Sequence, residues 1–123
     1  MRALVVDDSR AVRLLISQVL AELGMDVLQA ANGQEALEQL RQNPDVELVL
    51  VDWNMPVMNG LDFIRAVRAQ RAFDSVRILM VTTETEGAQV TRALEAGANE
   101  YLMKPFSKEV LIAKLSLMDV ISE

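Results

Sequence analysis

The segment that decides the fold is LVLVDWNMPVMNG, which runs from Leu48 to Gly60. Its apolar run, Val49 to Val51, suits only a protein interior, yet it ends in a carboxylate, Asp52. A negative charge at the end of a buried strand costs free energy unless other groups compensate for it. The position of Asp52 therefore points to a function rather than to packing.

Short apolar runs alternate with helical patterns along the whole chain. The apolar runs, which predict strands, cover residues 3–6, 25–29, 46–51, 77–81 and 99–103. Apolar residues at helical spacing predict helices over residues 10–23, after the capping pair Asn32 and Glu35, around residues 63–67, over residues 88–96, and after Ser107.

Five βα units with continuously apolar central strands predict a parallel sheet with helices on both faces. We expect a flavodoxin-like (βα)5 three-layer α/β sandwich with strand order 2-1-3-4-5. Nothing in the composition marks an internal boundary, so residues 1–123 are expected to form one domain.

Composition excludes several classes of function. The chain has no cysteine and no histidine, which rules out disulfides, thiolate chemistry, imidazole metal ligands and a Ser-His-Asp triad. Its 18 acidic and 12 basic residues give a net charge of −6, which argues against direct nucleic-acid binding. No apolar run approaches the ~20 residues of a membrane span. A cytoplasmic protein is the expectation.

Acidic residues end two of the predicted strands. Asp7 and Asp8 follow the first strand, and Asp52 ends the third. These strands are neighbours in the expected order, so the three carboxylates should share one crevice at the carboxyl edge of the sheet. Two carboxylates ~5 Å apart repel by roughly 3 kcal/mol at an effective dielectric constant of ~20. Such a cluster needs a cation or a shared proton, and its hard oxygen ligands suit Mg²⁺.

Simpler interpretations exist for each of these residues. Asp7 or Asp8 could cap the first helix, Thr82 could be a turn residue, and Lys104 could be a solvated lysine. Thr82 and Lys104, however, end the fourth and fifth strands. Together with the acids they would supply a hydroxyl and an ammonium around a phosphoryl group, with Asp52 as the nucleophile.

Four segments carry a resemblance to a known family. In order along the chain they are DDSRAVR, VDWNMPVMNG, MVTTE and YLMKPF. Their sequence and their positions at strand ends resemble the CheY-like receiver domain of two-component response regulators, over essentially the whole chain. As a set these motifs are highly specific, whereas each alone would be weak.

The resemblance implies a role for each matching residue. Asp52 would be the phosphoacceptor, taking phosphate from the phosphohistidine of a sensor kinase. Asp7 and Asp8 would hold Mg²⁺ together with Asp52 and the backbone carbonyl of Asn54.

The last two strand ends would bind the phosphoryl group and transmit the change. Lys104 would contact the phosphoryl group and Thr82 would turn toward it. Tyr101 would be the switch aromatic that moves inward when Thr82 vacates its space, or else an ordinary half-buried strand aromatic. The Lys104-Pro105 peptide bond matches one that is cis in the family.

The resemblance also implies which kinds of partner the protein has. A sensor histidine kinase or phosphotransfer domain would donate phosphate, and an effector protein or a covalently linked output domain would read the surface of the fourth helix, fifth strand and fifth helix. The segment GAQVTRALEAG lacks the lysines that are characteristic of the chemotaxis regulators, so the downstream target stays open. A monomer without membrane contact is expected.

Two other functions are alternatives to the signalling switch. A haloacid-dehalogenase-like phosphatase also forms an aspartyl phosphate, but it needs a second acid two residues after the nucleophile, where this chain has Asn54. A degenerate receiver could act as a constitutive scaffold, although the acidic, hydroxyl and lysine positions are complete. Asn54 and Glu84 occupy positions that the family uses to tune dephosphorylation. Trp53 and Met58 are expected to be packing residues.

Overall fold

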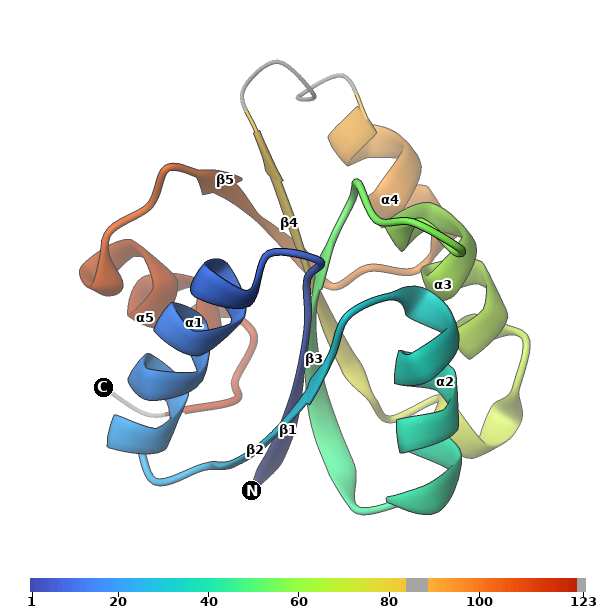
Figure 1. Cartoon of the computed structure of the whole chain (residues 1–123), viewed down its shortest axis with the longest axis horizontal. Coiled ribbons are helices and arrows are strands. Elements are labelled where there is room, and N and C mark those ends of the chain that lie inside the picture. The colour runs from blue at the N-terminus through green and yellow to red at the C-terminus, as the bar shows by residue number, and fades with distance from the viewer. Residues whose placement is uncertain (84–88, 122–123) are drawn as a thin grey trace.

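The computed structural model describes residues 1–83 and 89–121. Five parallel strands form one sheet in the order β2-β1-β3-β4-β5, as predicted (Figure 1). The strands are β1 (Arg2–Val6), β2 (Asp26–Ala30), β3 (Val46–Asp52), β4 (Arg77–Thr83) and β5 (Glu100–Lys104). Their bounds differ from the expected ones by up to two residues.

Helices cover both faces of the sheet, which gives the three expected layers (Figure 1). They are α1 (Arg10–Glu22), α2 (Gly33–Gln42), α3 (Gly60–Arg68), α4 (Val90–Ala96) and α5 (Lys108–Leu117), with a short 3-10 turn η1 (Arg71–Phe73) that the sequence pattern did not predict. Helices α1 and α5 share one face, and α2, α3 and α4 share the other. Ala88, expected at the start of the fourth helix, lies outside the described residues, as does Glu84.

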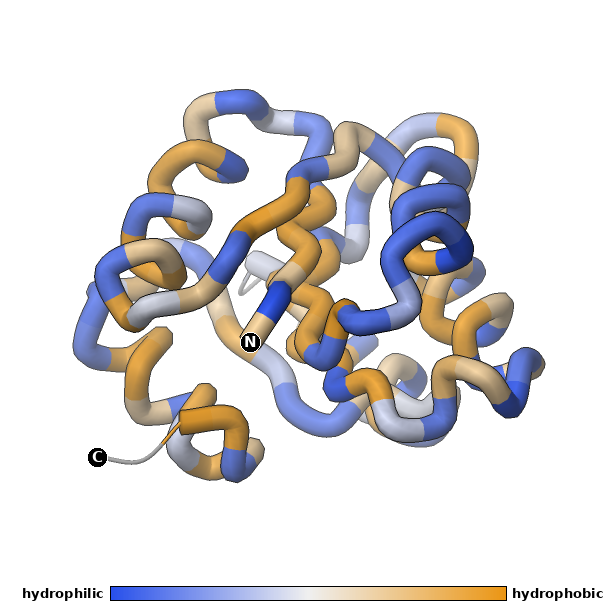
Figure 2. Tube along the Cα trace, turned by 90° about the horizontal axis from the view of Figure 1, so that it is seen from below, coloured by the Kyte–Doolittle hydropathy of each residue, from blue (hydrophilic) through white to orange (hydrophobic). Residues whose placement is uncertain are grey.

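The core has two halves, one on each side of the sheet. In β3, Val49 and Val51 belong to the half under α2, α3 and α4, while Leu48 and Leu50 belong to the half under α1 and α5. Because side chains alternate along a strand, a strand buried on both faces needs apolar residues at every position. In Figure 2 the trace through the middle of the molecule is largely orange, whereas the surrounding helices mix orange with blue.

Local capping fixes where two of the helices begin. Asn32 is the N-cap of α2, and its Oδ1 accepts a hydrogen bond of 2.9 Å from the backbone N of Glu35. Ser107 is the N-cap of α5, and its Oγ accepts one of 3.2 Å from the backbone N of Val110. Both caps were predicted from residue type and spacing.

Helix α5 differs from the expected apolar pattern. Leu111 and Leu115 are buried against the sheet, whereas Val110 is 45% exposed and Leu117 is 70% exposed. Only one face of the helix packs on the sheet, so apolar residues on its outer face are partly exposed to solvent. Within the described part of the chain, no helix combines the length and apolarity that crossing a bilayer requires.

Candidate functional site

Strand register brings the candidate residues to one edge of the sheet. Val6 of β1 pairs with Val51 of β3, and Asp52 pairs with Val81 of β4. Thr83 pairs with Lys104 of β5. The carboxyl ends of β1, β3 and β5 therefore lie at the same edge, which is where open parallel sheets carry their functional groups.

Three carboxylates meet at this edge. Asp7, Asp8 and Asp52 each offer an oxygen atom, and these atoms lie within 4.8 Å of one another. Asp7 is 2% exposed and Asp52 is 7% exposed, whereas Asp8 faces solvent. The predicted convergence of the three acids is confirmed. The cluster therefore has two buried acids and one that is open to solvent.

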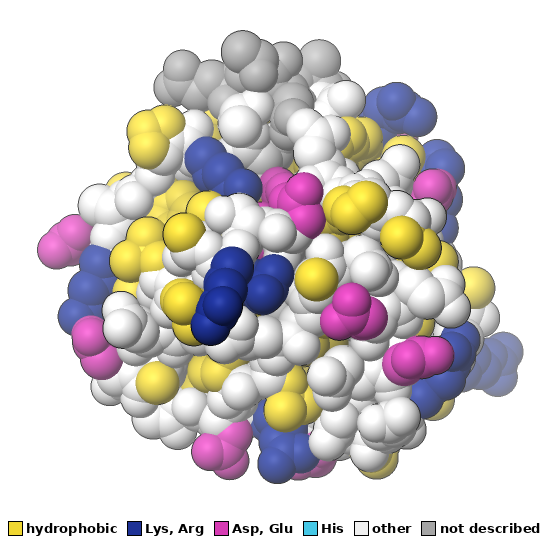
Figure 3. Space-filling view, viewed as in Figure 1, with side chains coloured by type: hydrophobic (Ala, Val, Ile, Leu, Met, Phe, Trp, Pro, Cys, Tyr) yellow, Lys and Arg dark blue, Asp and Glu magenta, His cyan; other side chains and the backbone are white. Residues whose placement is uncertain are grey.

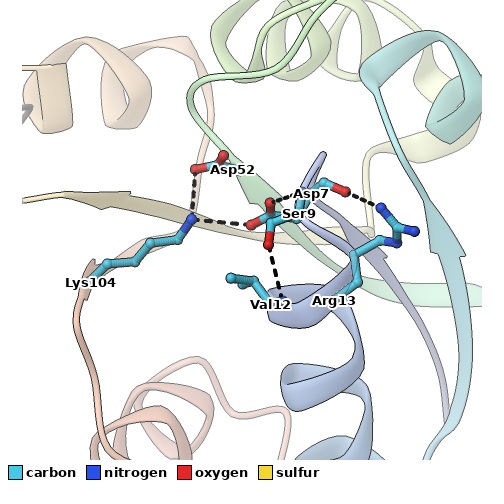
Figure 4. A network of polar contacts seen from close by, with 6 residues as sticks. All are labelled: Asp7, Ser9, Val12, Arg13, Asp52 and Lys104. Atoms are coloured by element: carbon cyan, nitrogen blue, oxygen red, sulfur yellow. Dashed lines mark hydrogen bonds and ion pairs between the residues drawn. The ribbon is translucent and has the colours of Figure 1, made fainter.

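Lys104 joins the two buried acids (Figure 4). Its Nζ donates to Asp7 Oδ2 at 3.2 Å and to Asp52 Oδ1 at 3.3 Å. Only 22% of the lysine side chain is exposed. The interpretation of Lys104 as a solvated lysine is therefore wrong. One ammonium among three carboxylates leaves an excess of negative charge in the site.

This arrangement shifts the protonation equilibria of Asp52 and Lys104. Burial, and then the charge of Asp7, raise the pKa of Asp52 from 3.8 to about 6, although Lys104 acts to lower it. Burial acts to lower the pKa of Lys104, but the charges of Asp52 and Asp7 outweigh it and raise that pKa above 10.5. Lys104 is consequently a permanent cation, and Asp52 is a carboxylate of raised proton affinity.

Asp7 is held by residues of the loop and helix that follow it (Figure 4). The backbone N of Ser9 donates to Asp7 Oδ1 at 2.8 Å, and Arg13 Nη1 donates to the Asp7 carbonyl at 2.6 Å. Ser9 is also the N-cap of α1, since its Oγ accepts from the backbone N of Val12. The alternative that Asp7 or Asp8 caps this helix is therefore wrong.

Ser9 and Arg13 support the site without having been predicted from the sequence. Ser9 stands directly before the apolar periodicity of α1, which is the usual N-cap signal and could have identified it. Arg13 lies one helical turn further on, on the same helix. No sequence signal links its side chain to the carbonyl of Asp7.

The loop after β3 folds back tightly onto Asp52. The backbone N of Gly60 donates to the carbonyl of Trp53 at 2.9 Å. A Cβ on Gly60 would lie 2.5 Å from the carbonyl oxygen of Asp52, closer than real Cβ atoms approach backbone. Trp53 is buried and Met58 packs against the same core, so both are packing residues as predicted. Glycine at position 60 is required by this close approach.

The remaining predicted residues lie around the cluster. Thr82 is fully buried within β4, so it is not a turn residue. Asn54 is exposed in the loop after Asp52. Tyr101 lies on the edge strand β5 and is partly buried, and the Lys104-Pro105 peptide bond is cis. In Figure 3, acidic and basic side chains lie side by side near this edge of the sheet.

An apolar groove adjoins the acidic cluster. It is lined by residues of α1, of the ends of β4 and β5, and of the segment after β5, namely Val12, Leu15, Thr83, Lys104, Pro105 and Phe106. Figure 3 shows hydrophobic side chains gathered on this side of the molecule. Leu15 is 55% exposed. Lys104 lines the groove and also contacts Asp52, so the groove and the acidic cluster are continuous.

Comparisons with known proteins agree with this geometry. The family model of the response regulator receiver domain matches residues 3–116. The chain is 48% identical over 119 residues to a chemotaxis protein CheY1 of Helicobacter pylori, covering 96% of each chain. It is 48% identical over 116 residues to a CheY homologue of Campylobacter jejuni, covering 94% of this chain and 89% of that protein.

Solved structures give the same result. The chemotaxis response regulator CheY4 of Vibrio cholerae superposes with a TM-score of 0.86 at 38% identity, covering 98% of both chains. A putative two-component response regulator with a GGDEF domain superposes with a TM-score of 0.91 at 31% identity. It matches the whole of this chain, which spans 51% of that protein.

The chain belongs to the family of response regulator receiver domains. Its function is phosphorylation-activated signalling of the two-component type. Members of this family are regulators rather than classical enzymes, and they bind Mg²⁺ at an acidic cluster such as the one formed by Asp7, Asp8 and Asp52. CheY-like domains act together with histidine kinases and effector proteins.

Proposed function

We propose that Asp52 is the phosphoacceptor of this protein and that Asp7, Asp8 and Lys104 form the rest of its phosphorylation site. The observation that carries the proposal is the meeting of three carboxylates within 4.8 Å of one another, with one lysine between the two buried ones. Such a site suits an incoming phosphoryl group, whose charge a cation and hydrogen-bond donors must share.

In the proposed reaction, an Asp52 carboxylate oxygen attacks the phosphorus of a phosphohistidine. The P–O bond of an acyl phosphate forms, the P–N bond breaks, and the imidazole leaves and takes up a proton. Lys104 Nζ, 3.3 Å from Asp52 Oδ1, carries a fixed positive charge toward the transferred oxygens. Water later hydrolyses the acyl phosphate, which resets the protein without an added phosphatase.

The donor set fits Mg²⁺. Oxygens bound to one Mg²⁺ at 2.0–2.1 Å lie about 3–4 Å apart, which is compatible with three carboxylate oxygens within 4.8 Å. Asp7, Asp8 and Asp52 would hold the ion together with the backbone carbonyl of Asn54. When bound, the ion would neutralise phosphoryl charge and offset the repulsion among the acids.

Thr82 and Tyr101 are proposed to convert phosphorylation into a surface change. The phosphoryl group adds roughly −1.5 to −2 charges and new acceptor oxygens beside β4. The Thr82 hydroxyl would then turn to donate to this group, and the ring of Tyr101 would move into the space that Thr82 leaves. The affected surface is made by α4, β5 and α5, where an effector would bind.

A phosphohistidine-bearing surface of a sensor kinase or phosphotransfer domain is proposed to dock on the groove between α1 and the segment after β5. The groove is apolar and continuous with the site through Lys104, so a partner seated there could present its imidazole to Asp52. Leu15→Glu should slow phosphotransfer from a protein donor and leave labelling by acetyl phosphate unchanged. Equal slowing with both donors would contradict this docking site.

The proposed setting is that of a single receiver domain, residues 1–123, acting as a monomer in the cytoplasm. An effector could be a separate protein or a linked output domain. Direct DNA binding by this domain is not proposed, since its net charge is −6.

Acetyl phosphate labelling tests the phosphoacceptor. With Mg²⁺ present, the wild type should gain one acid-labile phosphate, and Asp52→Asn should gain none. Asp45→Asn is the matched control, because Asp45 stands just before β3, at the opposite end of that strand from Asp52, and its side chain is 63% exposed. Undiminished labelling of Asp52→Asn would contradict the proposal.

Fluorescence of Trp53 tests the metal site separately. It is the chain's only tryptophan and directly follows Asp52, so its emission should change with millimolar Mg²⁺. Asp8→Asn should weaken this response and Asp45→Asn should not. No response in the wild type would favour a constitutive scaffold instead.

A further inference from the structure

Three side chains meet at the outer edge of the sheet, beside the proposed switch residue. Lys114 Nζ of α5 lies 4.0 Å from the centroid of the Tyr101 ring and 3.3 Å from Glu100 Oε1. The same Glu100 oxygen accepts a hydrogen bond of 3.0 Å from the backbone N of Tyr101. We call Glu100, Lys114 and the Tyr101 ring the edge clamp.

The edge clamp is largely withdrawn from water. The Lys114 side chain is 20% exposed and that of Glu100 is 23% exposed. An ammonium held over an aromatic face is attracted to it, and the attraction grows as water is removed. Because Glu100 binds both the backbone of Tyr101 and the ammonium, it keeps Lys114 over the ring.

The edge clamp joins the two layers that cover the sheet. The Tyr101 ring packs on the core half under α2, α3 and α4, whereas Lys114 belongs to α5 on the opposite face. Tyr101 pairs with Met80, and Thr82 lies two residues further along β4 on the same face as Met80. A ring that moves along this face toward Thr82 moves away from the lysine of the other layer.

We propose that Lys114 is a positioning residue that holds Tyr101 at the edge of the sheet, with Glu100 orienting it. The inference rests on the proposed function, because it assumes that Tyr101 moves when Asp52 is phosphorylated. The edge clamp would then set the threshold of the switch. The free energy needed to break the contact between the Lys114 ammonium and the Tyr101 ring would then be part of the cost of activation, which phosphorylation has to supply.

Fluorine NMR reports directly on this ring, since Tyr101 is the only tyrosine of the chain. The protein is labelled with 3-fluorotyrosine and titrated with acetyl phosphate in the presence of Mg²⁺. Lys114→Met removes the cation, Lys114→Arg retains it, and Glu100→Gln removes only the carboxylate charge. Lys108→Met is the matched control, because Lys108 lies on the same helix but pairs with Glu22.

In Lys114→Met, the fluorine resonance should differ from that of the wild type before the donor is added and coincide with it after phosphorylation. The acetyl phosphate concentration at half change should fall about three- to ten-fold, as expected for the loss of a partly desolvated cation–π contact. Glu100→Gln should show a smaller fall. Lys114→Arg and Lys108→Met should behave like the wild type.

An unchanged midpoint in both Lys114→Met and Glu100→Gln, with folded spectra, would overturn the inference. A resonance of Lys114→Met that differs from that of the wild type equally before and after phosphorylation would also overturn it, because the lysine would then act only on the local environment. Failure of the proposed function looks different. In that case, adding acetyl phosphate would not change the fluorine resonance of the wild type or of any variant.

Discussion

Lys104 Nζ lies 3.3 Å from Asp52 Oδ1 and 3.2 Å from Asp7 Oδ2, so a single ammonium serves two buried carboxylates. Asp52 is 52 positions and Asp7 is 97 positions from Lys104 in the chain, yet both acids bind the same ammonium. The stability of the fold and the chemistry of the site are coupled through this contact, because each acid depends on the same cation.

Replacing Lys104 with Met should destabilise the metal-free protein by about 1–3 kcal/mol, a value reduced from that of a fully buried pair because the lysine is partly exposed. Asp7 and Asp52 would then repel each other without a counter-charge. Mg²⁺ should restore much of the loss and bind the variant several-fold more tightly than the wild type. Urea unfolding in EDTA and in Mg²⁺ measures both effects, and equal stability of the two proteins in EDTA would contradict the coupling.

The raised pKa of Asp52 predicts a pH-dependent stability. Because the pKa of Asp52 in the folded protein, about 6, exceeds its ordinary value of 3.8, the folded protein binds this proton more tightly than the unfolded chain does. Metal-free stability should therefore fall by about 1–3 kcal/mol as pH rises through this window. Asp52→Asn should lack this decline and be the more stable protein at pH 7. Urea unfolding in EDTA from pH 4 to pH 7.5 measures it, with Asp45→Asn expected to follow the wild type.

Gly60→Ala should damage both the fold and the site. The added methyl group meets the Asp52 carbonyl oxygen at 2.5 Å, so the strand end or the loop must shift, at a cost of about 1–3 kcal/mol. Labelling by acetyl phosphate should slow as well. Gly24→Ala is the control. The Cβ that it adds has no atom within 4 Å, so only the backbone φ of 88° is unfavourable for alanine there. Normal labelling of Gly60→Ala would show that Asp52 tolerates the shift.

Val57 is a site where stability can be gained. Its φ is 70°, a left-handed conformation that is unfavourable for a β-branched residue, and it is 80% exposed. Val57→Asn should raise the free energy of unfolding by about 1 kcal/mol, since asparagine adopts this conformation more readily. Val57→Ala should gain less. Thermal unfolding compares the three proteins, and a lower midpoint for the asparagine variant would contradict the prediction.

The order of the elements could be predicted from the sequence because its signals are local. The apolar run before Asp52 forms β3, and Asn32 and Ser107 cap the helices that follow them. The exact bounds of the elements depend on tertiary pairing as well. Thr82 was expected after the fourth strand but lies within it, since strand pairing with β5 extends to Thr83.

The candidate acids were also predictable, because parallel strands end at a common edge and their order could be inferred. The supports of these acids were not. Arg13 donates to the Asp7 carbonyl, and Gly60 accommodates the Asp52 carbonyl, through contacts that depend on how α1 and the loop after β3 pack. Nothing in residue spacing specifies such contacts.

By itself, the sequence determined the succession of strands and helices, the family and the residue types available at the strand ends. Residue periodicity and capping act over a few positions and can be read from a single chain. Only the tertiary structure decided that Lys104 lies between Asp7 and Asp52, and that Lys114 lies over the Tyr101 ring. Those distances depend on strand register, helix packing and side-chain rotamers together, which act between residues far apart in the sequence.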